Sequence, residues 1–151
     1  MNYRDKLKDP RWQKKRLEVF ESDNFTCQYC GDNKTELHVH HKRYKGEPWE
    51  ADMDDLITAC SHCHQIEEKF KTDSPGTKIL KVHKWWSSDK SILRIAVLAN
   101  YPIQGSVDQF NTAIFFHDVI GNKLTFLISS TYDDMKSIMA EFDNHLNPIK
   151  N

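Results

Sequence analysis

Residues 25–64 read FTCQYCGDNKTELHVHHKRYKGEPWEADMDDLITACSHCH, and this stretch holds all four cysteines of the chain. The cysteines form two Cys-x-x-Cys pairs, at Cys27 and Cys30 and at Cys60 and Cys63. Four thiolates complete a tetrahedral zinc shell, and such a saturated site is structural. The alternative is that a Cys-x-x-Cys pair is a redox site. Two such pairs at the spacing of zinc knuckles argue against that alternative. The sequence therefore predicts a structural zinc site.

Three histidines of the same stretch are free for a second site: His40, His41 and His64. Side chains alternate between the faces of a strand, which we expect at residues 37–40, so His40 and His41 diverge. A helix at residues 64–71 would bring His64 to His40. We therefore expect His40 and His64 to bind a divalent catalytic metal, with positions open for water and a phosphate oxygen. His41 would be the general base, because the ordinary pKa of histidine lies near neutrality. A single histidine is more often a solvated or structural side chain, and the grouping of three favours the site.

Composition and charge set the class of protein. The chain has 151 residues, of which 38% are hydrophobic and 28% charged, so a small core helped by a metal is expected. The first residues lack the apolar stretch of a signal peptide, and no apolar run approaches the roughly 18 residues of a membrane helix. Every cysteine lies in a Cys-x-x-Cys pair. These features predict a soluble, cytoplasmic protein, in a reducing compartment and without a membrane partner.

The net charge of −1 conceals an uneven distribution. Residues 1–16 contain seven Lys or Arg against two acidic residues, whereas residues 95–151 contain three basic residues against six acidic ones. The basic segment could contact nucleic acid, with Lys14 and Lys15 as candidates, although a solvated face is the more common reason for such a segment.

The pattern of the chain predicts an α+β protein with two domains, at residues 1–74 and 75–151. Asp9 and Pro10 resemble an N-cap followed by proline at the first helical position. In the first domain we expect, in order, a helix at 11–21, a strand at 37–40, a loop at 42–53, a strand or extended segment at 55–59 and a helix at 64–71. In the second domain the segment at 78–86 could be a strand or a helix. After it we expect a strand at 92–99, a β-hairpin at 113–119 and 123–129, and a terminal helix from Thr131.

The motifs FTCQYCG, LHVHHKRY, PWE and DDLITACSHCH, in this order, resemble the HNH endonucleases, which share the ββα-metal (His-Me finger) fold. The similarity covers about residues 3–71. It implies an enzyme that hydrolyses DNA phosphodiester bonds with one divalent metal, often Mg²⁺, beside a four-cysteine zinc site. By position, His40 and His64 match the family's metal ligands and His41 its general base.

The sequence departs from the family at Asp55, which occupies the place of an asparagine that braces the loop and orients the base histidine. An aspartate accepts a hydrogen bond from a ring N–H but cannot donate one, and it adds negative charge near a phosphate. We expect activity to survive, and Asp54 is an alternative for this role. A catalytically decayed, zinc-stapled module that binds DNA or protein is the competing interpretation.

Other candidates follow the histidine pair or the last cysteine. Lys42, Arg43 and Tyr44 are predicted substrate-binding residues, with a solvated loop as the equal alternative. Glu68, one helical turn after His64, could be an outer ligand, although a surface glutamate is the favoured interpretation. Trp85 and Trp86 could stack on bases, but hydrophobic packing between the two halves of the chain is favoured.

Overall fold

The computed structural model describes residues 1–86, 90–103, 110–120 and 123–127. It is an α+β protein with antiparallel sheets, as predicted. The chain divides into two compact units, Met1–Ile66 and Glu67–Asn151, and the division falls inside the unbroken helix α3, Ser61–Asp73. The domain boundary after residue 74 stays a prediction. Within the described ranges, no helix has the length and apolar character that crossing a membrane requires.

The first unit begins with two helices, α1 at Tyr3–Lys6 and α2 at Pro10–Ser22. The predicted cap of α2 is present, because an Asp9 side-chain oxygen accepts a hydrogen bond of 2.9 Å from the Arg11 amide. Trp12, Val19 and Phe20 form the buried side of α2. Trp12 and Val19 pack with Ala51 and Leu56 in a small core cluster, to which Leu7, Val39 and Trp49 add partial cover.

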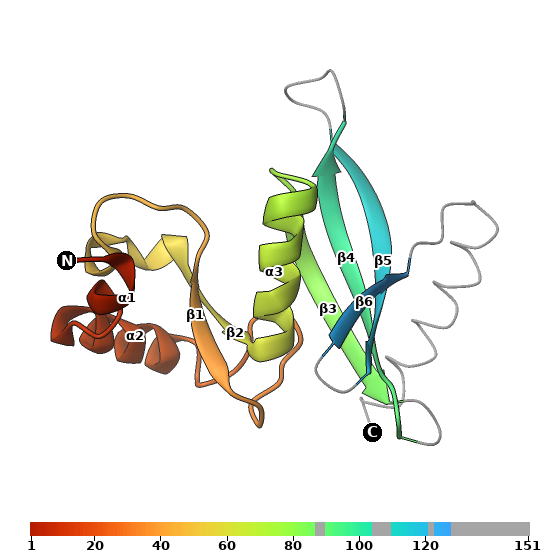
Figure 1. The fold of residues 1–151 in the computed structure, drawn as a ribbon, viewed down its shortest axis with the longest axis horizontal. Helices are drawn as coiled ribbons and strands as arrows, with labels where there is room; N and C mark the ends of the chain where they lie inside the picture. The colour runs from red at the N-terminus through yellow and green to blue at the C-terminus, as the bar shows by residue number, and fades with distance from the viewer. Residues whose placement is uncertain (87–89, 104–109, 121–122, 128–151) are drawn as a thin grey trace. The chain divides into compact units, whose positions relative to one another are not determined.

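Strands β1, Leu37–His41, and β2, Leu56–Cys60, form an antiparallel pair beside α2 (Figure 1). Two short 3-10 helices, Pro48–Glu50 and Met53–Asp55, lie in the connection between these strands. Helix α3 follows β2 directly, so the predicted strand, loop, strand, helix order is confirmed. This arrangement is the ββα element, with the pairing of His41 and Leu56 at the end of β1.

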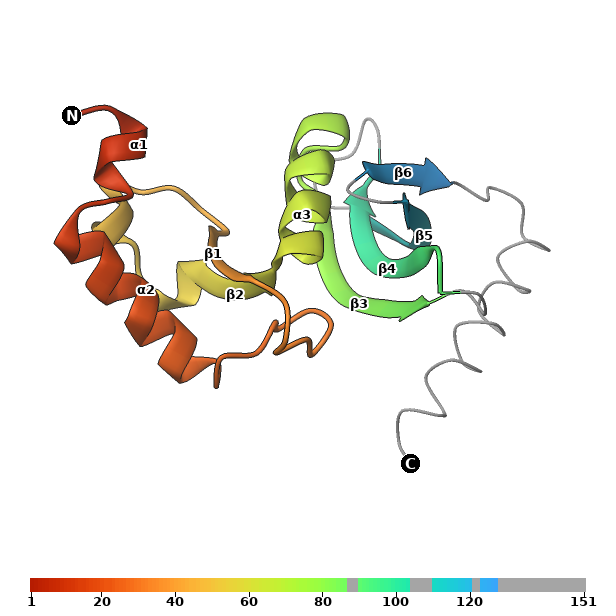
Figure 2. The ribbon, with the colours of Figure 1, turned by 60° about the horizontal axis from the view of Figure 1, so that its bottom comes forward.

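The second unit contains a four-stranded antiparallel sheet in chain order, and its strands curve strongly (Figure 2). The strands are β3 at Lys78–Trp86, β4 at Leu93–Pro102, β5 at Phe110–Ile120 and β6 at Lys123–Leu127. The ambiguous segment is therefore a strand, with a bulge between Ile79 and Lys81. The predicted β5–β6 hairpin is confirmed by the pairing of Ile120 with Lys123. Its turn residues 121–122 and the predicted terminal helix from Thr131 lie outside the described residues.

Helix α3 contributes Phe70 to the core of this second unit. The Phe70 ring meets the rings of Phe115 and His117 edge-on, with centroids 5.1 and 6.3 Å away. Phe70 and His117 are both buried, at 6% and 1% exposure. The apolar end of α3 thus has a structural role in the second unit, whereas its first turn carries residues of the candidate site.

Candidate active site

The four cysteines gather in one cluster. Cys27 and Cys30 lie in the turn after α2, where Gly31 takes the positive φ of 77° that such a knuckle requires. Cys60 ends β2 and Cys63 lies in the first turn of α3. The four sulfurs lie within 4.8 Å of one another, and Cys30 and Cys60 are 3.7 Å apart. A zinc ion with Zn–S bonds of about 2.3 Å requires S···S separations of about 3.8 Å, so this cluster fits a tetrahedral site.

The thiols of this cluster share protons with one another. A hydrogen bond with Cys30 lowers the pKa of Cys27 to about 6, and the same contact raises the pKa of Cys30 above its usual range. Hydrogen bonding with Cys27 likewise lowers the pKa of Cys60 and raises that of Cys63. The backbone N–H of Cys63 also donates to the Cys60 sulfur at 3.5 Å. Two of the four thiols thus have lowered pKa values, and thiolate is the form that binds zinc.

Alternation along β1 separates the histidines as predicted. The His38 and His40 rings both face His64 at the start of α3, with ring centroids 5.1 and 5.7 Å from it. The possible ligand atoms of His40, His64 and Glu68 lie within 4.8 Å of one another. Glu68, which the sequence favoured as a surface glutamate, is exposed and also belongs to this cluster. Two imidazoles and a carboxylate fit a divalent cation, so the residues present match the metal that the resemblance implies.

His41 points to the other face of β1, where its surroundings differ. Its ring stacks on Trp12 of α2 and on Tyr44, with centroid distances of 4.9 and 4.8 Å. Its Nε2 atom lies 3.2 Å from the carbonyl oxygen of Pro48. Because a carbonyl can only accept, Nε2 carries the proton in this contact. None of these three neighbours was anticipated from the sequence.

Asp55 is buried, and its carboxylate holds a neighbouring arginine. Both Nε and Nη2 of Arg43 lie 2.8 Å from the Asp55 Oδ1 atom. The backbone is joined at the same point, because the Lys42 amide donates to the Asp55 carbonyl at 2.7 Å. Asp55 therefore braces the start of the loop after β1, while His41 Nε2 donates to the carbonyl oxygen of Pro48. Asp54 is exposed.

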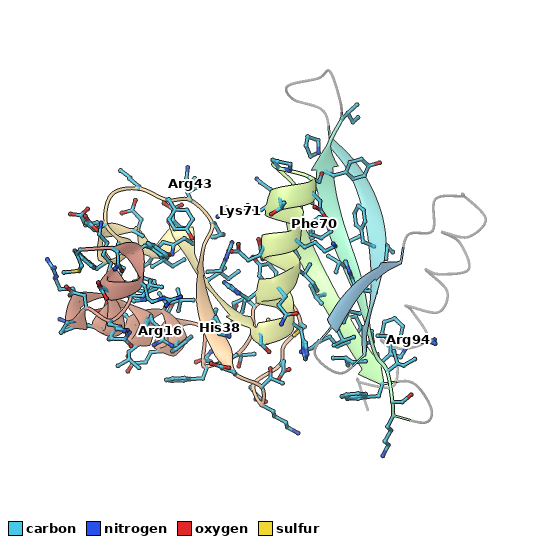
Figure 3. The ribbon with its side chains drawn as sticks, in the orientation of Figure 1. Arg16, His38, Arg43, Phe70, Lys71 and Arg94 are labelled. Carbon is cyan, nitrogen blue, oxygen red and sulfur yellow. The ribbon has the colours of Figure 1, made fainter. Side chains whose placement is uncertain are left out.

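The predicted nucleic-acid-binding residues lie on two elements. Lys42, Arg43 and Tyr44 are exposed in the segment that follows β1, and Figure 3 shows Arg43 projecting from it. Lys14 is exposed on α2 and Lys15 is half-buried there. In the second unit, Trp86 is 58% exposed, whereas Trp85 packs against the cluster of Ala96 and Ile114. Trp85 thus packs within its own unit, and the predicted packing between the two halves stays a prediction.

Comparison with known proteins identifies the family of this segment. Residues 27–70 match the family model described as HNH endonuclease. No curated protein and no solved structure matches the chain. The matched residues include both Cys-x-x-Cys pairs, the histidine pair of β1 and the first part of α3. The resemblance seen in the sequence is therefore confirmed for this part of the chain: residues 27–70 match the HNH endonuclease model, and four cysteines are placed to form a metal site.

Proposed function

We propose that the chain is an endonuclease that hydrolyses DNA phosphodiester bonds with a divalent metal and a histidine general base. One observation carries the proposal: the adjacent histidines His40 and His41 of β1 lie in two different surroundings. His40 faces His64 and Glu68, whose ligand atoms gather within 4.8 Å, whereas His41 is held by ring stacking and a backbone carbonyl. Metal-assisted hydrolysis with a general base needs both a metal ligand and a base, and the two faces of β1 can supply one each.

His40, His64 and Glu68 would hold the metal, Mg²⁺ or another divalent ion. Three protein ligands leave coordination positions for water and a phosphate oxygen, and a metal there supplies charge stabilisation at the reacting phosphate. The separate four-cysteine cluster would hold a structural zinc ion, because it has no vacant position once four thiolates bind. The two sites thus differ in ligand chemistry as well as in role.

His41 would take the proton from the attacking water. With its Nε2 proton committed to the Pro48 carbonyl at 3.2 Å, the neutral imidazole carries its lone pair at Nδ1. The hydrogen bond therefore selects the tautomer in which Nδ1 is the basic atom. His41 is 5% exposed, so the ring is held in a largely dry position and depends on its neighbours for orientation.

Exposed cations near the histidines would contact the DNA backbone. Lys42 and Arg43 directly follow His41 in the chain, and Lys14 and Lys15 add positive charge on α2. The Arg43 side chain is 79% exposed, although two of its nitrogens are bonded to Asp55. A guanidinium anchored in this way loses less rotamer freedom when it binds a phosphate. Contacts of this kind predict binding that weakens with salt and depends little on base sequence.

A binding module without catalysis is the second candidate, and Asp55 is the observation that favours it. A carboxylate in place of the family's asparagine adds negative charge beside the site. The Arg43 guanidinium offsets that charge at 2.8 Å. The aspartate therefore weakens the catalytic proposal less than its charge alone suggests.

The test is cleavage of supercoiled plasmid DNA with Mg²⁺, Mn²⁺ or no added metal, beside the His41→Ala variant. We expect metal-dependent nicking or cutting by the wild-type protein and a loss of at least about 100-fold in His41→Ala. Far-UV circular dichroism and zinc content must be unchanged in the variant. Incubation with a single-stranded RNA under the same conditions tests whether the protein prefers DNA or RNA. Equal metal-dependent rates for wild type and variant would refute the role of His41, and plasmid binding without cleavage by either would support the binding module.

A further inference from the structure

The His41 imidazole stacks on two aromatic rings. The interplanar angle is 21° with the indole of Trp12 and 17° with the phenol ring of Tyr44. Their centroids lie 4.9 and 4.8 Å from that of His41. These distances and small angles are those of stacked aromatic pairs. The proposed base is thus in stacking contact with two aromatic rings.

The two outer rings differ in how firmly they are held. Trp12 comes from α2, is 4% exposed and belongs to the core cluster with Val19 and Leu56. Tyr44 lies three residues after His41 and is 55% exposed. Trp12 is therefore a fixed support, because moving it would disrupt the core. Tyr44 is a cover whose removal leaves the core intact.

Stacking and hydrogen bonding restrain different motions of the imidazole. The contact from Nε2 to the Pro48 carbonyl restrains the direction of the ring edge, and the two stacking rings restrain the tilt of its plane. Together they define where the Nδ1 edge points. A general base must meet its proton at hydrogen-bonding distance and with good alignment, so a tilt of the ring lowers the rate without weakening substrate binding.

We propose that Tyr44 is a positioning residue, which restrains the tilt of the His41 imidazole by the stacking of its ring and not through its hydroxyl. This inference rests on the proposed function of His41 as the general base. The alternative role for an exposed tyrosine in a nuclease is stacking on a nucleobase. In the structure, one face of the Tyr44 ring is already occupied by His41. The two roles differ in the kinetic constant they affect, so they can be separated.

The kinetic test uses Tyr44→Phe and Tyr44→Leu, with Tyr3→Leu as the matched control. Tyr3 is exposed to a similar extent, 50% against 55%, and lies in α1. We expect Tyr44→Leu to lower kcat roughly three- to tenfold at unchanged KM, because one stacked pair is lost. Tyr44→Phe, which keeps the ring, should stay within about twofold of wild type. A raised KM at unchanged kcat would overturn the proposal and assign Tyr44 to the substrate.

A second readout is independent of cleavage. Ring currents from two stacked neighbours shift the His41 ring protons upfield in aromatic ¹H–¹³C NMR spectra, and Tyr44→Leu should remove part of this shift whereas Tyr44→Phe should not. An unchanged His41 resonance in Tyr44→Leu would overturn the proposal whatever the kinetics. If the wild-type protein cuts no DNA but the resonance moves as expected, the proposed function fails while the stacking of Tyr44 on His41 stands.

Discussion

The four-cysteine cluster predicts that the first unit folds only with zinc bound. A unit of 66 residues, Met1–Ile66, has an expected stability of about 3–10 kcal/mol at the usual 0.05–0.15 kcal/mol per residue. Zinc binding to a site of this kind contributes about 10–16 kcal/mol. The core cluster around Trp12 and Val19 is small, so hydrophobic packing in this unit does not offset the loss of the zinc-binding free energy. Removing the metal should therefore unfold the unit rather than loosen it.

The perturbation is Cys63→Ser, with Ser61→Ala as the control. Cys63 is fully buried and in the first turn of α3, so the variant loses a thiolate and places a hydroxyl in its position. Ser61 lies inside the same Cys-x-x-Cys pair, and its backbone amide, which an alanine keeps, bonds to the Glu36 carbonyl at 3.0 Å. The control thus changes the same turn without changing a ligand.

Zinc content and far-UV circular dichroism measure the outcome together. We expect one zinc per chain and cooperative melting in wild type and in Ser61→Ala. Cys63→Ser should bind zinc weakly and lose helical signal from α2, and a chelator should produce the same change in the wild-type protein. The reasoning is refuted if Cys63→Ser, without zinc, melts at the wild-type temperature with the same denaturant dependence.

Three further predictions concern single side chains. The side-chain hydrogen bond with Arg11 lowers the pKa of Asp9 from 3.8 to about 2, so the charged cap stabilises α2 fully above about pH 4 and is lost as the pH falls through 2. Asp9→Ala should therefore lower the melting temperature of the zinc-bound protein at pH 6, where the cap is fully charged, and an unchanged melting temperature would contradict this. Arg43→Ala should lower the free energy of unfolding by about 1 kcal/mol in urea titrations. The reason is that the Asp55 carboxyl, 8% exposed, loses the guanidinium as its partner, which solvent replaces only in part. Adding Asp55→Asn to the Arg43→Ala variant should recover part of the loss. Glu68→Gln should weaken Mn²⁺ binding roughly tenfold in calorimetry at unchanged zinc content, because one anionic ligand is lost, and unchanged Mn²⁺ affinity would exclude Glu68 as a ligand.

The sequence predicts those parts of the site that depend on local periodicity. Two-residue alternation in a strand sends His40 and His41 to opposite faces whatever the rest of the chain does. Constraints of this kind act over a few residues, so a single sequence is enough to predict them. The predicted helix begins at His64, whereas α3 begins at Ser61, so the structure places both Cys63 and His64 in its first turn.

The contacts that could not be predicted join distant residues or use the backbone. Trp12 stacks on His41 across 29 positions of sequence, and the Pro48 carbonyl, like any backbone group, has no sequence signature. For Glu68 the spacing to His64 already indicates a possible outer ligand, and what the fold adds is its closeness to His40 from the distant strand β1. The segment at Lys78–Trp86 lacks clean alternation because both faces of the sheet are partly covered, as the burial of adjacent residues in β4 shows.

The aspartate at position 55 shows how the fold changes the meaning of a departure from a family pattern. On sequence alone, a carboxylate in place of an amide indicates added negative charge near a phosphate and a lost donor. In the structure that charge is paired with Arg43 at 2.8 Å, and the loop is also joined to the 3-10 helix Met53–Asp55, just before β2, by the bond from the Lys42 amide to the Asp55 carbonyl. Bracing of the loop therefore does not need an amide side chain here. The orientation of His41 does not need one either, since the Pro48 carbonyl and two aromatic rings restrain that ring. Both tasks that the resemblance gives to asparagine thus have other groups in this chain to perform them, and this favours the enzyme over the decayed module.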